Sequence, residues 1–224
     1  MLLTIPAVLS AGQLRKVQLL LADAPFVDGK LSAGKQAERV KHNLELDSGA
    51  DKLAAQLNNI VMGSLVQHPV YQYAALPLRV AAPFYARYSA GMHYGKHVDD
   101  PIMGTAEHYR SDISITVFLN APDAYQGGEL VIHTAFGTQW IKRPAGDAVM
   151  YPSSSLHEVS QVTDGERLVA VTWVQSVVRD PAQRELLYEL YQARETLLRD
   201  RPGAPETNQV SNAYVNLLRM WSEV

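Results

Sequence analysis

Histidine and aspartate side chains are the strongest candidates for chemistry in this sequence, because it contains no cysteine. Thiolate zinc sites, iron–sulfur clusters and cysteine nucleophiles are excluded, and a metal would need ligands from His, Asp, Glu or water. His97-Val98-Asp99 sets an imidazole and a carboxylate two residues apart, and on a strand such residues point to the same face. His157 begins a predicted strand after the serine-rich loop 152–155 and is the best candidate for a third ligand. The sequence therefore predicts a three-ligand metal site.

The open side of such a site suggests its chemistry. Two imidazoles and one carboxylate on one side of an ion leave the opposite positions free, which is the facial arrangement of non-haem Fe(II) oxygenases. Oxygen and a co-substrate could then bind together. The same ligands could also hold zinc. Other histidines and acids are interpreted as solvated or hydrogen-bonded structural groups: His93, His108 with Asp112, and His133 with Glu129.

Arg167 follows His157 by ten residues, beyond the turn signal Asp164–Gly165. A guanidinium can bind a carboxylate through two parallel hydrogen bonds. A two-residue hairpin at this turn would put Arg167 and His157 on opposite faces. A three-residue loop over 163–165, with Gly165 left-handed, pairs Gln161 with Arg167 and restores one face. We therefore predict this bulged hairpin; without the three candidate ligands, Arg167 would be interpreted as a surface strand residue.

The elements that position these residues fall into three segments. Residues 1–75 are expected to be mainly helical and to pack on a β core, and residues 179–224 to form a C-terminal helical extension. Residues 76–178 are expected to form the core, since Asp112 to Leu119 alternates between an apolar and a more polar face. Short strands separated by turn signals, without helices between them, favour an antiparallel barrel or sandwich.

Capping residues mark the expected helices. Ser10 and Gln13 have the spacing of a capping box. A second helix is expected to follow Ser48, and Asp180 is expected to cap a third. A final helix is expected at about 207–221, where apolar residues recur at helical spacing.

The composition suits one domain with a sizeable core. The 224 residues are 47% hydrophobic and carry a formal net charge of −3, which argues against disorder and against a broad basic surface for nucleic acid. Residues 1–9 are apolar but lack the basic start of a secretory signal. No stretch approaches the roughly 18–20 apolar residues that span a bilayer. We therefore expect a cytoplasmic protein with no nucleic-acid or membrane partner.

Several stretches together resemble the 2-oxoglutarate/Fe(II) dioxygenases of the prolyl-4-hydroxylase type. The resembling residues are 85–99 (YARYSAGMHYGKHVD), 111–120 (SDISITVFLN), 127–130 (GGEL), 144–147 (PAGD), 157–159 (HEV) and 165–173, which begins GER and ends at Trp173. The segment 173–180 (WVQSVVRD), followed by a helix, resembles the bacterial PKHD-type hydroxylases. With that group the likeness covers nearly the whole chain.

The resemblance implies an α+β fold with a mainly β core: a distorted double-stranded β-helix, or jelly-roll barrel, flanked by N- and C-terminal helices. It implies that His97, Asp99 and His157 hold Fe(II). It further implies that Arg167 binds the distal carboxylate of the co-substrate 2-oxoglutarate.

Two tyrosines gain candidate roles from the same resemblance. Tyr88 matches a tyrosine that donates a hydrogen bond to that carboxylate, and Tyr94 matches one near the pocket mouth. For both, amphipathic core packing with a satisfied hydroxyl is the alternative. The group is described as iron- and ascorbate-dependent, and it is associated with bacterial iron-uptake genes.

The implied reaction is hydroxylation of a substrate by O2, with succinate and CO2 as co-products. The substrate stays open among a protein side chain, a peptide, a siderophore-like molecule and a free metabolite. The segment 101–109, which contains Gly104, is interpreted either as a lid or substrate loop or as an ordinary surface connection. The terminal helices suit homo-oligomer contacts as well as packing on the barrel.

Two other function classes stay open at this point. One is a non-catalytic module that binds a metal or 2-oxoglutarate as a sensor, and the other is a zinc-dependent enzyme on a similar barrel. Ligand binding without turnover would indicate the first, and oxygen-independent activity with zinc would indicate the second. The position of Arg167 argues against both, because neither needs a fixed cation beside a dicarboxylate.

Overall fold

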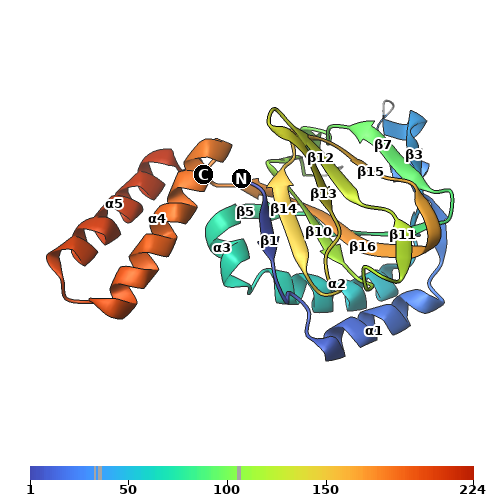
Figure 1. Cartoon of the computed structure of the whole chain (residues 1–224), viewed down its shortest axis with the longest axis horizontal. Coiled ribbons are helices and arrows are strands. Elements are labelled where there is room, and N and C mark those ends of the chain that lie inside the picture. The colour runs from blue at the N-terminus through green and yellow to red at the C-terminus, as the bar shows by residue number, and fades with distance from the viewer. Residues whose placement is uncertain (33, 35–36, 105–106) are drawn as a thin grey trace.

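Helices α1–α3, a larger sheet and a smaller sheet are stacked in three layers (Figure 1). The computed structural model describes residues 1–32, 34, 37–104 and 107–224. The helical elements are α1 (Ala11–Ala22), α2 (Asp51–Leu65), α3 (Pro69–Ala75), α4 (Pro181–Asp200) and α5 (Pro205–Trp221), with the 3-10 turns η1 (Gly29–Ser32) and η2 (Ala37–Arg39).

The two sheets contain only antiparallel pairings among the described residues. The larger sheet has the order β1 (Leu3–Ile5), β14 (Ala148–Pro152), β10 (Ile113–Phe118), β16 (Val162–Ser176), β6 (Phe84–Ser89), β4 (Leu44–Leu46) and β2 (Phe26–Asp28), while β5 (Pro77–Val80) and β11 (Tyr125–Gly127) pair with β16. The smaller sheet has the order β13 (Gly137–Ile141), β12 (Leu130–Thr134), β15 (Leu156–Val159), β7 (His93–His97) and β3 (Lys41–His42). The short strands β8 (Ile102–Met103) and β9 (Tyr109–Arg110) pair with each other. The fold is thus a mixture of helices and mostly antiparallel sheet.

Strand β10 shows why the layers stack in this order. Its residues are all buried, because each face of the strand meets a different layer. Ile113, Ile115 and Val117 pack with the helices, whereas Phe118 packs in the cluster between the two sheets. The alternation read from the sequence is confirmed, and it places the polar face of β10 toward the interior between the sheets.

The predicted helix caps are confirmed. Ser10 and Gln13 form a capping box at the start of α1, and the Asp180 side chain accepts hydrogen bonds from the first turn of α4. Helices α4 and α5 pack against each other as a hairpin that projects away from the sheets (Figure 1). A small apolar cluster that includes Leu76 and Val178 joins this hairpin to α3.

The first 75 residues contribute more than helices. Strands β1, β2 and β4 extend the larger sheet, and β3 is the terminal strand of the smaller one. These strands are two or three residues long, which is too short for an alternating pattern to be visible in the sequence. The turn at Asn43 carries the chain from one sheet to the other.

The predicted bulged hairpin at residues 163–165 is wrong. Strands β15 and β16 belong to different sheets, and the chain crosses between them at residues 160–161. Gly165 does have a left-handed φ of +72°, but it lies within β16 opposite Tyr125 of β11. The register of these two strands shifts at Thr163, between the pairs Gln126–Asp164 and Gly127–Val162. A Cβ at Gly165 would clash with the carbonyl of Ala124, so the Asp164–Gly165 signal marks a strand irregularity and not a chain reversal.

Candidate functional site

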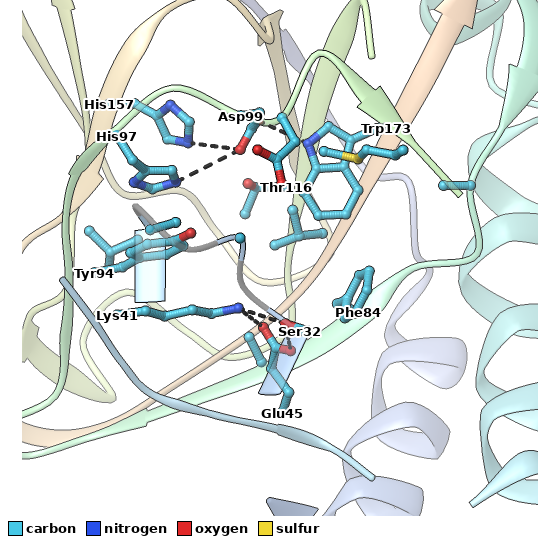
Figure 2. Close-up of a pocket in the computed structure, with 18 of the residues that line it drawn as sticks. Ser32, Lys41, Glu45, Phe84, Tyr94, His97, Asp99, Thr116, His157 and Trp173 are labelled. Atoms are coloured by element: carbon cyan, nitrogen blue, oxygen red, sulfur yellow. Dashed lines mark hydrogen bonds and ion pairs between the residues drawn. The ribbon is translucent and has the colours of Figure 1, made fainter. Parts of the chain in front are cut away.

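The two candidate histidines face each other across neighbouring strands. His97 ends β7 and His157 lies in β15, and the antiparallel register pairs them directly. Their ring centres are 4.2 Å apart. Asp99 lies two residues beyond β7, outside any strand, so a loop and not a strand turns its carboxylate toward the two rings (Figure 2).

The three side chains are arranged around a common point. Oδ1 of Asp99 lies 3.8 Å from Nε2 of His97 and 3.7 Å from Nε2 of His157, and the three ligand atoms all lie within 4.8 Å of one another. These distances are too long for hydrogen bonds. Ligand atoms sit roughly 2.0–2.2 Å from a metal ion, so neighbouring ligands are about 3 Å apart. A small contraction would therefore fit this set around one ion.

The histidines present the correct nitrogen for such an ion. Nδ1 of His97 lies 2.8 Å from the carbonyl oxygen of Gly95, and Nδ1 of His157 lies 3.0 Å from that of Ser155. Because Nδ1 donates in both rings, Nε2 is left as the acceptor. Burial, together with the neighbouring His157, lowers the pKa of His97 to about 4. Its imidazole is thus neutral near pH 7, as coordination requires.

The carboxylate of Asp99 is held by one of its two oxygens. Oδ2 accepts hydrogen bonds from Nε1 of Trp173, at 2.9 Å, and from Oγ of Ser114. The Ser114 hydroxyl in turn lies 2.8 Å from that of Ser153. Oδ1 is left to face the histidines. Trp173 and Ser114 were not predicted as partners of Asp99, although Trp173 shares a strand face with Arg167 and Ser114 belongs to the polar face of β10.

Arg167 is buried in β16, and no acidic side chain in the described part of the chain forms an ion pair with it. Its side chain is 1% exposed, and among the described residues Nε and Nη1 have no hydrogen-bond partner. A buried cation in this state is costly unless an anion completes it, so the donor set fits a carboxylate ligand. Gly128, with a φ of +66°, gives the side chain room, because a Cβ there would lie 3.1 Å from Cδ of Arg167.

The two candidate tyrosines lie beside these groups. Tyr88 is directly opposite Arg167 in the β6–β16 register, and its ring centre is 5.0 Å from the guanidinium carbon. Burial raises the pKa of Tyr88 to about 12, so its hydroxyl stays protonated and can donate. Tyr94 stacks on the His97 ring, with ring centres 3.7 Å apart and planes inclined by 13°.

One cavity of about 590 Å³ joins these groups, a size within the roughly 300–1,000 Å³ of ligand pockets. Strands β8 and β9 contribute Ile102, Met103 and Tyr109 to its lining. The predicted lid segment 101–109 therefore borders the cavity, although its residues 105–106 lie outside the described residues. The lining includes all six residues singled out from the sequence: Tyr88, Tyr94, His97, Asp99, His157 and Arg167.

The other histidines and acids weighed in the sequence lie elsewhere. Nε2 of His133 is 2.9 Å from Glu158, and Glu158 alternates with His157 and therefore faces away from the cavity. His93 packs edge-on against His42, with ring centres 5.8 Å apart. Asp112 pairs with Arg110 at 2.6 Å. Within the described parts of the chain, only His97, Asp99 and His157 form a group of three or more potential metal ligands.

Comparison with known proteins identifies the family. Residues 83–175 match the model of the 2OG-Fe(II) oxygenase superfamily, and residues 181–223 match the PKHD-type hydroxylase C-terminal domain. The chain is 56% identical to a PKHD-type hydroxylase of Thioalkalivibrio sulfidiphilus and 44% identical to one of Stutzerimonas stutzeri, in both cases over the full length of both chains. The chain belongs to the PKHD-type hydroxylases. This hydroxylase is therefore a 2-oxoglutarate-dependent dioxygenase, and its family implies Fe(II) and 2-oxoglutarate.

Solved structures show the same fold at low sequence identity. A 2OG-Fe(II) oxygenase family oxidoreductase of Burkholderia pseudomallei is 18% identical, with a TM-score of 0.54 over 77% of this hydroxylase and 82% of that chain. A prolyl hydroxylase of Trichoplax adhaerens is 17% identical, with a TM-score of 0.52 over 83% and 86%. Among the described residues of the hydroxylase, no helix has the length and apolar character to cross a membrane.

Proposed function

We propose that this hydroxylase inserts oxygen into a C–H bond of its substrate with Fe(II) held by His97, Asp99 and His157. Arg167 and Tyr88 bind the distal carboxylate of 2-oxoglutarate, and Tyr94 borders the iron side of the cavity. The observation that carries the proposal is the presence, in one cavity, of three potential metal-ligand atoms and a buried guanidinium, two of whose nitrogens have no acceptor among the described residues. A bound metal would be coordinated by the three ligand atoms, and a bound dicarboxylate would accept hydrogen bonds from the guanidinium.

The chain's own residues provide binding and orientation. When bound, Fe(II) lets O2 convert 2-oxoglutarate to succinate and CO2 while one oxygen atom enters the C–H bond. The Trp173 and Ser114 hydrogen bonds fix which Asp99 oxygen faces the ion, and the buried walls exclude water from the reacting groups. Arg167 fixes the far end of the co-substrate and so directs its keto acid toward His97, Asp99 and His157.

The proposal also covers the sheet architecture, the loop beside the cavity, the cellular location and the subunit contacts, which the sequence and the resemblance lead us to expect. The two facing sheets form a distorted double-stranded β-helix, and segment 101–109 acts as a substrate loop over the cavity that it borders. The enzyme works in the cytoplasm, depends on ascorbate as well as iron, and is linked to bacterial iron uptake. The α4–α5 hairpin, which projects from the sheets, provides homo-oligomer contacts.

Anaerobic reconstitution tests the proposal. The purified chain is loaded with Fe(II) and 2-oxoglutarate, O2 is added, and succinate is measured by chromatography. We expect slow succinate release even without the main substrate, and none with Zn(II) in place of Fe(II). Oxygen-independent activity with Zn(II) would contradict the proposal.

The Asp99→Ala substitution tests the metal ligands directly. We expect it to abolish Fe(II)-dependent succinate release, because it removes the only carboxylate of the set. Asp123→Ala, at an exposed aspartate, is the matched control and should keep full activity. Normal succinate output from the Asp99 variant would remove Asp99 from the site.

A further inference from the structure

A second polar cluster lines the cavity beside Tyr94 (Figure 2). Nζ of Lys41 lies 2.5 Å from Oε1 of Glu45 and donates to Oγ of Ser32 at 2.9 Å. The Ser32 hydroxyl lies 2.5 Å from the second oxygen of Glu45. We call Lys41, Glu45 and Ser32 the Lys41 cluster. The iron and 2-oxoglutarate roles proposed above use none of these three residues.

The Lys41 cluster lies within reach of a molecule at the metal site. Nζ of Lys41 is 5.3 Å from the ring centre of Tyr94, and that ring centre is 3.7 Å from the ring centre of His97. The ammonium is therefore no more than about 9 Å from the His97 ring. A small polar group a few bonds from the reacting carbon of a substrate would reach it.

The cluster keeps unused hydrogen-bonding capacity although its ion pair is buried. The side chains of Lys41 and Glu45 are 6% and 9% exposed. An ammonium has three N–H donors, and among the described residues the Lys41 ammonium has two acceptors, Glu45 and Ser32. A carboxylate offers about four acceptor positions, so Glu45 can accept another donor from the cavity.

A purely structural role would explain why Lys41 and Glu45 lie next to each other, but not why the two residues are charged. Lys41 lies in β3 of the smaller sheet and Glu45 in β4 of the larger one, so the ion pair bridges the two sheets. A buried ion pair, however, is seldom more stabilising than apolar residues of the same volume. A polar bridge in a cavity wall instead provides donors and acceptors for a bound molecule.

We propose that the Lys41 cluster binds an amide group of the substrate. The amide oxygen accepts the third N–H of Lys41, and the amide N–H donates to the Glu45 carboxylate. This inference rests on the proposed function, since it places the amide beside the metal site. It narrows the open list of substrates to molecules with an amide near the hydroxylated carbon.

The charges around the cluster favour a neutral group over an ion. A substrate carboxylate near Lys41 would meet the carboxylate of Glu45 only 2.5 Å from the ammonium, and a substrate amine would meet Lys41 itself. Asp100, on the cavity rim, adds a further negative charge that disfavours anions. An ester accepts a hydrogen bond but has no N–H, so it would use only half of the cluster.

Binding of four matched probes tests the inference. Hexanamide, hexanoate, hexylamine and methyl hexanoate share an apolar chain and differ in the head group. Their dissociation constants are measured by saturation-transfer NMR, with Zn(II) and excess 2-oxoglutarate present so that hexanoate does not occupy the Arg167 site. We expect hexanamide to bind at least tenfold more tightly than the other three. The dissociation constant of N-acetyl-leucine methylamide is measured in parallel. Tighter binding than hexanamide indicates that the amide belongs to a peptide, and weaker binding indicates that it belongs to a small molecule.

Substitutions connect the preference to the cluster. In Glu45→Gln, which keeps the shape of the side chain, and in Lys41→Met, we expect the preference for hexanamide to fall below threefold. Lys52→Met and Glu189→Gln, at exposed positions, are the matched controls and should keep it. Equal binding of the four probes, no binding of any, or an unchanged preference in Glu45→Gln would overturn the inference. A separate titration of 2-oxoglutarate reports on the proposed function alone, and we expect it to change less than twofold in these variants.

Discussion

Replacing Arg167 by methionine should lower the affinity for 2-oxoglutarate without lowering the stability of the ligand-free protein. The guanidinium is buried beside Tyr88, and two of its nitrogens have no acceptor among the described residues. We expect Arg167→Met to weaken 2-oxoglutarate binding strongly while leaving the ligand-free protein as stable as before or more stable. Methionine keeps most of the apolar stem and adapts to irregular space, so little packing is lost.

The size of both effects follows from the burial of the group. Removing one partner of a buried charge pair costs about 3–5 kcal/mol, and about 1.4 kcal/mol corresponds to a factor of ten in affinity. The dissociation constant of 2-oxoglutarate should therefore rise by a factor of roughly 100 to 4,000. In the ligand-free chain, each unsatisfied buried polar group costs about 1–3 kcal/mol. Relief of that cost should raise the melting temperature by roughly 2–4 °C per kcal/mol for a chain of this size.

Calorimetric titration of 2-oxoglutarate into the Zn(II)-loaded protein measures the first effect, and scanning calorimetry of the metal-free protein measures the second. Arg79→Met is the matched control, because the Arg79 side chain is 50% exposed and pairs with Glu107 at the surface. The control should leave both quantities nearly unchanged. An unchanged 2-oxoglutarate affinity in Arg167→Met, or a melting temperature lowered by several degrees, would show that Arg167 has a structural role instead.

Two further substitutions probe the supports of the site. Trp173→Phe removes the indole donor to Asp99 and should weaken metal binding about 10- to 100-fold. The affinity is measured by Mn(II) titration followed by electron paramagnetic resonance. Trp140→Phe, at a 65% exposed tryptophan, should keep the wild-type affinity, and equal affinities in the two variants would contradict the role given to Trp173. Gly128→Ala places a methyl group against Arg167 at a positive φ, so we expect lower thermal stability together with weaker 2-oxoglutarate binding. Wild-type values for both would mean that the backbone at Gly128 adjusts freely.

The candidate ligands could be predicted from the sequence because their signals are local and chemical. His97 and Asp99 lie two residues apart, and the absence of cysteine restricts the choice of partners. The sequence carries no local signal for the cross-strand pairing of His97 with His157; His157 was chosen because it begins a predicted strand after the serine-rich loop, and the resemblance supported the choice. The Asp99 carboxylate faces the two histidine rings from a loop. The prediction that Asp99 lies near His97 is therefore right, but the prediction that both lie on one strand is wrong.

The position of Arg167 was predicted by reasoning that the structure contradicts. The expected hairpin placed it beside His157, whereas β15 and β16 lie in different sheets. Glycine at residue 165 signalled a left-handed backbone, but the sequence does not distinguish a chain reversal from an irregularity within a strand. Lys41 and Glu45 carried no signal at all, because strands of two or three residues show no period.

Strand β16 lies between β10 and β6 in the larger sheet, and this order has a consequence for biosynthesis. Both neighbours leave the ribosome long before β16 does, so a growing chain carries two strand edges with unsatisfied backbone groups. Such edges invite pairing with other chains. Residues 162–176 therefore close both edges at once, and until they have been synthesised the growing chain is exposed to pairing with other chains.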